Sequence, residues 1–173
     1  MRTAKLTRPN GIGSSDLFGT ITNTQHIMSI HIGIDPGVNG GIAVLGHQGY
    51  AQAYNMPPTN KDLWELIQEI KAAADLEKYP ARATLEFVSS SPQMGVKSAF
   101  TFGNGYGHLE MALTAAGIPF ERVRPQAWQK AMGCLTKGDK NVTKRRAQEL
   151  FPQLKITHAT ADALLIAAYG AKQ

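Results

Sequence analysis

The chain has 173 residues, of which 43% are apolar, and it carries one cysteine and a formal net charge of +5. This length supports one sizeable core; no run approaches the roughly 20 apolar residues of a membrane span, and no apolar segment follows the basic start as in a secretory signal. Cys134 has no partner for an internal disulfide or a CxxC zinc site, so we expect an intracellular protein with a reduced thiol.

Residues 1–28 form a polar N-terminal extension. They are rich in Thr, Ser, Asn and Gly and lack apolar periodicity, so we expect them to be poorly ordered. Two origins are open: residues 1–27 are a transit peptide, which would allow an organelle, or translation starts at Met28, the interpretation that we favour. The folded domain is expected to comprise residues 29–173.

Three strands are predicted at the start of this domain. Ile30, Ile32 and Ile34 alternate with other residues, and the run GGIAVL follows a glycine-rich turn. Alternation returns at 50–54, before two consecutive prolines. This pattern is typical of a three-stranded antiparallel meander.

Helices and strands alternate in the rest of the chain. Asn60 is expected to cap a helix that ends before Pro80, and the run ATLEFV predicts a buried strand. The later segments are a helix through 108–116, a strand at 120–123, and helices at 126–132, 143–150 and 157–171. Without the short helix at 126–132, the predicted order is β-β-β-α-β-α-β-α-α. This order indicates an α/β fold with a mixed five-stranded sheet, three antiparallel strands followed by two further strands, flanked by helices.

Three acidic residues stand in apolar surroundings. Asp35 follows the first strand, Glu86 lies inside the run LEFV, and Asp162 lies inside ADALLIAAY. Carboxylates in such places repel one another and resist ionisation unless a cation gathers them, and Mg²⁺ and Mn²⁺ prefer carboxylate oxygen. These three are candidate catalytic and metal-binding residues. His158, one helical turn before Asp162, is a candidate metal ligand or a residue that positions the attacking water.

Each acid also has an alternative role. Asp35 can cap a turn, Glu86 can pair with Arg82 or a lysine, and Asp162 can bond to His158. If they act together, a site with two metal ions about 3.5–4 Å apart would hydrolyse a phosphodiester in line, without a covalent nucleophile.

Basic residues are concentrated between positions 121 and 146, a segment that contains eight Lys and Arg but only two acidic residues. The rest of the chain has ten basic and eleven acidic residues. This concentration favours phosphate contact, with a solvated helix face as the alternative. Phe102 and Tyr106, among glycines at the expected opening of the middle helix, are candidates for stacking on an unpaired DNA base, with core packing as the alternative. The basic candidates for DNA binding are Lys137, Lys140, Lys144, Arg145 and Arg146.

Several motifs together resemble the RuvC-type Holliday junction resolvases, most of all their plant plastid branch. They are IGIDPGVNGGIAVL, LEFV, the FGNGYG turn, QAWQK, the GDK ahead of the basic helix, ELFP and HATADALLIAAYG, and they cover residues 30–171. The resemblance implies an RNase H-like fold, a homodimer, and symmetric nicking of four-way DNA junctions with two Mg²⁺ or Mn²⁺ ions per site. It also implies the cytoplasm or nucleoid of a bacterium or a phage-infected cell.

Position by position, the resemblance implies that Asp35, Glu86 and Asp162 are the metal-binding acids and that Lys140 approaches the scissile phosphate. The family has a fourth metal-site side chain shortly before the last acid, and here His158 takes that place. Two other functions are open: a non-catalytic, YqgF-like nucleic-acid-binding relative, and a nucleotide-binding domain of the actin-like or sugar-kinase type, which would need a second lobe.

Overall fold

The computed structural model describes residues 29–89, 93–135 and 139–173. The expected N-terminal extension, residues 1–28, lies outside this part of the chain, as does Lys137. Within the described residues, no helix combines the length and the apolar character that a membrane span needs. The elements are β1 (Ile30–Asp35), β2 (Gly41–Leu45), the short 3-10 helix η1 (His47–Gly49), β3 (Ala51–Asn55), α1 (Asn60–Glu77), β4 (Ala81–Glu86), α2 (Val96–Ala115), β5 (Phe120–Val123), α3 (Pro125–Ala131), α4 (Lys140–Leu150) and α5 (His158–Gly170).

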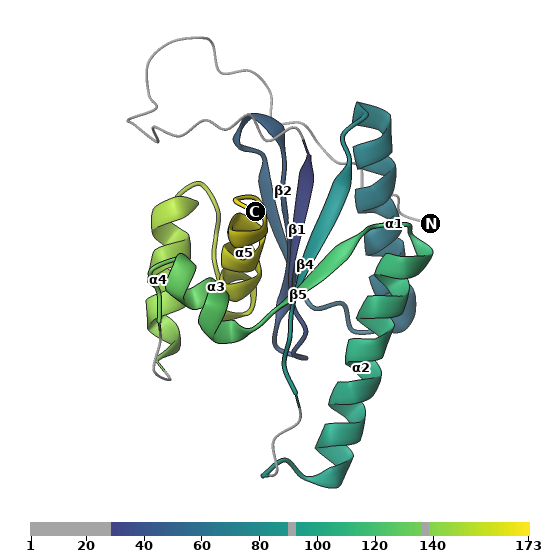
Figure 1. The fold of residues 1–173 in the computed structure, drawn as a ribbon, viewed down its shortest axis with the longest axis vertical. Coiled ribbons are helices and arrows are strands. Elements are labelled where there is room, and N and C mark those ends of the chain that lie inside the picture. Colours follow the sequence, from purple (N-terminus) through teal and green to yellow (C-terminus); the bar gives the residue numbers. More distant parts are fainter. Residues whose placement is uncertain (1–28, 90–92, 136–138) are drawn as a thin grey trace.

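One five-stranded sheet forms the centre of the molecule, with the strand order β3-β2-β1-β4-β5 (Figure 1). β1, β2 and β3 pair antiparallel, whereas β4 lies parallel to β1 and β5 parallel to β4. The predicted mixed sheet is therefore confirmed. Because Ile34 is in register with Leu85, the acids that follow them, Asp35 and Glu86, end neighbouring parallel strands at the same edge of the sheet.

Helices cover both faces of the sheet: α1 and α2 lie on one side, and α3, α4 and α5 on the other (Figure 1). The isoleucines of β1 belong to the core cluster that α1 and α2 complete. A second cluster contains most of α5 together with Ala43 and Leu45 of β2 and Trp128 of α3. The alternation of side chains along a strand thus assigns successive residues to the two cores.

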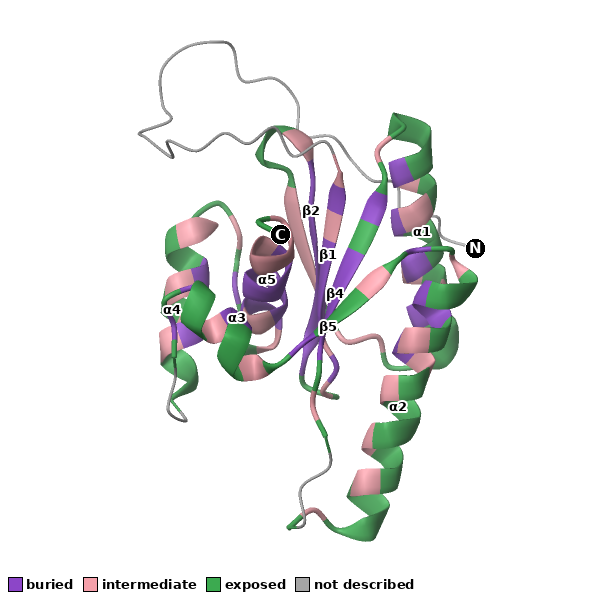
Figure 2. Ribbon diagram, viewed as in Figure 1, coloured by how far each residue is buried: buried purple, intermediate pink, exposed green. Residues whose placement is uncertain are grey.

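Glycines let α5 approach the sheet closely. A Cβ on Gly33 of β1 would come within 2.2 Å of the Ala163 carbonyl oxygen and the Ala167 nitrogen, and one on Gly170 within 2.2 Å of Thr84 Oγ1. The packing therefore requires hydrogen in place of a side chain at these points. As a result α5 is buried along most of its length, as Figure 2 shows in purple.

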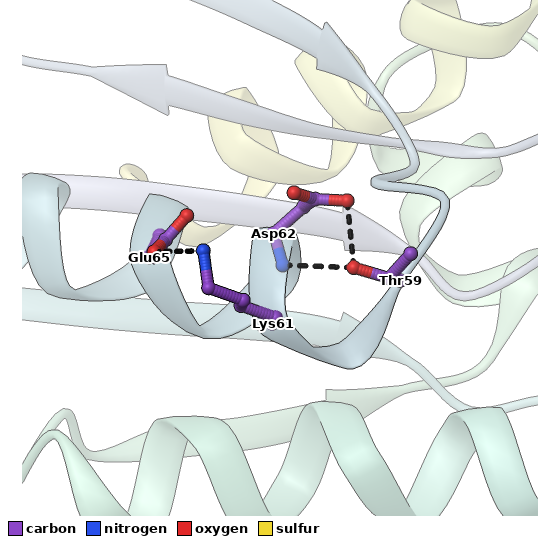
Figure 3. A network of polar contacts seen from close by, with 4 residues as sticks. All are labelled: Thr59, Lys61, Asp62 and Glu65. Carbon is purple, nitrogen blue, oxygen red and sulfur yellow. Dashed lines mark hydrogen bonds and ion pairs between the residues drawn. The ribbon is translucent and has the colours of Figure 1, made fainter. Parts of the chain in front are cut away.

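The N-cap of α1 is Thr59, not Asn60 as expected. Thr59 Oγ1 accepts a hydrogen bond from the Asp62 backbone N–H (3.1 Å) and donates one to Asp62 Oδ2 (2.7 Å), as Figure 3 shows. A cap must lie outside the helix and reach the third residue within it, and Thr59 meets both conditions while Asn60 is already helical. Lys61 and Glu65 add an ion pair one turn apart on the same helix.

The middle helix departs most from the prediction. α2 begins at Val96, so Phe102 and Tyr106 lie in its interior and the FGNGYG segment is not a turn at its opening. No side chain between 96 and 108 is buried, and this lack of a buried stripe explains why apolar periodicity did not reveal the first half of the helix. The short helix α3 (Pro125–Ala131), by contrast, matches the helix predicted at 126–132.

Candidate active site

Three carboxylates from different elements meet at one end of the sheet: Asp35 at the end of β1, Glu86 at the end of β4, and Asp162 in the second turn of α5. The charge of Asp162 raises the pKa of Asp35, and the charges of Asp35 and Asp162 both raise the pKa of Glu86. Such mutual effects require proximity. We call these three residues the acidic centre.

Asp35 is half-buried where β1 enters the turn to β2. Burial raises the pKa of its carboxyl, and the backbone N–H of Gly37, which donates to Oδ1 over 3.3 Å, and the charge of Lys140 act in the opposite direction. A Cβ on Gly40 would lie 2.7 Å from the Asp35 Cγ, so the turn needs glycine there. Asp35 therefore caps the turn, which was the alternative role expected for it, and it also lies near the other two acids.

Glu86 has a buried partner that was not among the expected ones. Its side chain is 8% exposed, and Trp128 Nε1–H donates a hydrogen bond of 2.8 Å to Oε1. Burial raises the pKa of Glu86 to about 7, against the lowering effect of the indole N–H. Arg82 forms no ion pair with Glu86 in the described part of the chain. The motif QAWQK contains the tryptophan, but nothing in the sequence indicates which acid it would meet.

Asp162 carries a buried oxygen, Oδ1, that has no hydrogen-bond partner among the described residues. Burial raises the pKa of this carboxyl, and Thr143, Lys140 and His158 lower it. His158 is exposed as the first residue of α5 and acts on Asp162 through its charge. An unpartnered buried carboxylate oxygen is costly, so a cation bound at that point would stabilise the site.

The acidic centre fits a hard divalent cation by its chemistry. Its donors are carboxylate oxygens, which Mg²⁺ and Mn²⁺ prefer, and a cation would relieve both the mutual repulsion and the unpartnered oxygen of Asp162. Within residues 29–89, 93–135 and 139–173, no three His, Cys, Asp or Glu side chains are grouped closely enough to hold an ion as they stand. Binding would therefore require the side chains to draw closer together.

Helix α4 brings positive charge to the acidic centre. Lys140, its exposed first residue, acts on both Asp35 and Asp162. Lys144 and Arg145 follow one turn later, with Arg145 exposed. Arg146 differs from them: its Nε donates to the Met132 carbonyl oxygen over 3.0 Å and its Nη1 pairs with Glu149. Arg146 therefore ties α4 to the residue that follows α3.

The aromatic candidates lie on α2, on the other face of the sheet. The Phe102 and Tyr106 rings are 6.2 Å apart between centroids. Tyr106 packs against the core cluster under α1 and α2, and its hydroxyl is buried near Arg122, whereas Phe102 is partly exposed. Their stacking role stays a prediction. Added Cβ atoms on Gly103, Gly105 and Gly107 would meet nothing within 4 Å, and none of these glycines has a positive φ.

The mixed five-stranded sheet, with this strand order and helices on both faces, defines the RNase H-like class of fold. Among solved structures, RuvC of Thermus thermophilus matches the chain with a TM-score of 0.57 and 19% identity, over 83% of this chain and 95% of that one. RuvC of the same organism in complex with Holliday junction substrate matches with a TM-score of 0.55, the same identity and the same coverage. No family model and no curated protein matches the chain. The RuvC-like fold implied by the motifs is thus confirmed.

Proposed function

We propose that residues 29–173 are a divalent-metal-dependent DNA endonuclease that resolves four-way junctions by symmetric nicking. The observation that carries this proposal is the convergence of Asp35, Glu86 and Asp162 from β1, β4 and α5, with one buried carboxylate oxygen unpartnered. The support from likeness is a fold shared with RuvC, of which one solved structure contains a Holliday junction substrate.

Each residue of the proposed site has a distinct task. The acidic centre would hold Mg²⁺ or Mn²⁺, with His158 as the fourth ligand. Two bound ions would supply an activated water and neutralise charge on the leaving oxygen. Lys140, whose charge already reaches two of the acids, would approach the scissile phosphate. The remaining proposed DNA contacts are Lys137, Lys144, Arg145, Phe102 and Tyr106. Arg146 instead supports α4 through its bonds to Met132 and Glu149.

A homodimer is part of the proposal, since two sites must address opposing strands of a junction. The support is an exposed apolar stripe on α2, opposite its core-facing side. Three of its side chains are 88%, 76% and 61% exposed, and glycines between them would let a second helix approach closely. The members of the stripe, at helical spacing, are Val96, Phe100, Gly103, Gly107 and Met111.

The direct test is cleavage mapping on a mobile four-way junction, with linear duplex as comparison, in Mg²⁺ or Mn²⁺. We expect Asp35→Asn, Glu86→Gln and Asp162→Asn each to lower nicking by about 1,000-fold or more, because each variant loses a negative charge that would bind the cation. Junction binding should survive, because the basic surface remains. Asp75→Asn, the same chemical change on α1 beside Lys71, should leave nicking unchanged. Loss of binding in parallel with activity would contradict the assignment.

A second comparison separates catalysis from affinity. Lys140→Ala should slow cleavage more than it weakens binding, whereas Arg145→Ala should chiefly weaken binding and reduce its dependence on salt. Equal effects of both variants on rate and affinity would refute this division of tasks.

The dimer can be tested by sedimentation. Gly103→Leu, on the stripe, should shift the protein toward monomer at micromolar concentration, whereas Gly105→Leu, on the opposite side of α2, should not. A wild-type monomer at that concentration would count against the dimer.

The same assays separate the alternative functions. Junction binding without nicking in either metal would favour a non-catalytic, YqgF-like relative. ATP turnover without DNA cleavage would favour the kinase-like class. A junction substrate would place the protein in the cytoplasm or nucleoid of a bacterium or a phage-infected cell, or in an organelle if residues 1–27 are a transit peptide.

A further inference from the structure

Trp128 contacts the acidic centre from α3, and no residue of this helix belongs to the proposed site described above. Its indole is fully buried, at 0% exposure, and Nε1–H donates to Glu86 Oε1 over 2.8 Å. Glu86 itself is 8% exposed. A hydrogen bond between two groups that water hardly reaches is not readily exchanged for solvent. The orientation of the Glu86 carboxylate therefore depends on the position of α3.

The chemistry of the donor suits this task. An indole N–H donates one hydrogen bond, accepts none and carries no charge. A lysine or arginine in the same place would neutralise Glu86 and compete with a cation. Tryptophan instead fixes one carboxylate oxygen and leaves the negative charge in place. Hydrogen bonds of this kind commonly orient carboxylates that bind metals.

Helix α3 is held firmly enough to act as a fixed support. The Met132 backbone N–H donates to the Trp128 carbonyl oxygen over 2.9 Å, and the Met132 carbonyl oxygen accepts from Arg146 of α4 over 3.0 Å. The Trp128 ring belongs to the same core cluster as α5. The donor to Glu86 is thus tied to α4 and α5, which carry Lys140 and Asp162.

We propose that Trp128 is a positioning residue of the acidic centre: by holding Oε1 of Glu86 it orients the carboxylate that, with Asp35 and Asp162, would hold a divalent cation. This inference rests on the proposed function, because the cation belongs to it. A tryptophan with a merely structural role would bury the same ring area, but its loss would not change the affinity of the protein for metal.

The chain has two tryptophans, so the ¹⁵N-labelled full-length protein gives two indole N–H signals, and Trp64→Phe assigns them. Adding Mg²⁺ without DNA should move the Trp128 signal and leave that of Trp64 in place. Glu86→Gln should move the Trp128 signal and abolish its response to Mg²⁺. This measurement needs no variant at Trp128, so it holds even if such a variant does not fold.

Trp128→Phe then tests the consequence. We expect its affinity for Mg²⁺, measured by calorimetry without DNA, to fall by about 10-fold or more, and kcat on a junction to fall with KM unchanged. Trp64→Phe, which removes an indole N–H from a partly buried ring on α1, should alter neither quantity. A Trp128 signal that ignores Mg²⁺, or wild-type affinity in Trp128→Phe, would overturn the inference.

Failure of the inference and failure of the function give different results. Wild-type nicking together with an equally active Trp128→Phe of unchanged Mg²⁺ affinity removes the positioning role and keeps the nuclease. A Trp128 signal that responds to Mg²⁺ and a weakened affinity in Trp128→Phe, without nicking of any junction by the wild type, keep the positioning role and remove the nuclease.

Discussion

Glycines occur at the packing surface of α5 and within α2, but they leave very different amounts of space around the two helices. Gly33 and Gly170 let α5 pack directly on β1 and β4, where a Cβ would come within 2.2 Å of other atoms. Gly103, Gly105 and Gly107 of α2 face open space, and Figure 2 shows the lower half of that helix in green and pink. The close contact brings Asp162 to the acids of the sheet, whereas the open part of α2 carries the stripe proposed above for a homodimer. In the described chain, glycine serves close internal packing at α5 and leaves open space at α2.

The strongest test of this contrast is Gly33→Ala. We expect the free energy of unfolding to fall by about 3 kcal/mol, because backbone atoms of α5 that cannot rotate away occupy the position of the new methyl group. Chemical denaturation of the metal-free protein measures the change. A loss below about 0.5 kcal/mol, the usual range for surface substitutions, would mean that α5 does not rest on β1 this closely.

The acidic centre should make the free energy of unfolding depend on pH. Burial raises the pKa of Glu86 from 4.5 to about 7, so between these pH values the native state holds more protons than the unfolded state. The free energy of unfolding should therefore fall as pH rises through this interval, by on the order of 2 kcal/mol. Denaturation of the metal-free protein from pH 4 to 8 measures the slope. Glu86→Gln should reduce the slope to the part that the raised pKa values of Asp35 and Asp162 contribute, and an unchanged slope in that variant would assign the effect to another group.

Substitution of Arg146 tests whether this residue supports the fold or contacts DNA. Arg146→Met should lower the free energy of unfolding by about 1 kcal/mol, because the Met132 carbonyl oxygen loses a charged donor. The salt dependence of junction binding should change less than it does for Arg145→Ala. The opposite ranking of the two variants would return Arg146 to the group of direct phosphate contacts.

The smallest expected effect has the opposite sign. Gly105→Ala should raise the free energy of unfolding by about 0.5–1 kcal/mol, because alanine favours the helix and its methyl group meets nothing within 4 Å. Thermal unfolding measures this gain. A loss of stability would mean that α2 is not helical around this residue or that the position is covered.

Much of the fold could be predicted from the sequence because local patterns suffice for it. The alternation at Ile30, Ile32 and Ile34 reflects the period of two with which side chains point to the two faces of a strand. The first half of α2 was not predicted, because none of its residues is fully buried and no core-facing apolar stripe marks it. The cap of α1 was missed by one residue, since Thr59 and Asn60 are both good capping residues.

The candidate site could also be predicted only in part from the sequence. The sequence by itself determined that Asp35, Glu86 and Asp162 are out of place in an apolar core, because the cost of burying a carboxylate follows from its neighbours along the chain. Only the tertiary structure decided that the three lie together, that Glu86 is held by Trp128 rather than by Arg82, and that Arg146 is tied to Met132. These contacts join residues far apart in the chain, and they depend on how closely α5 and α3 pack against the sheet.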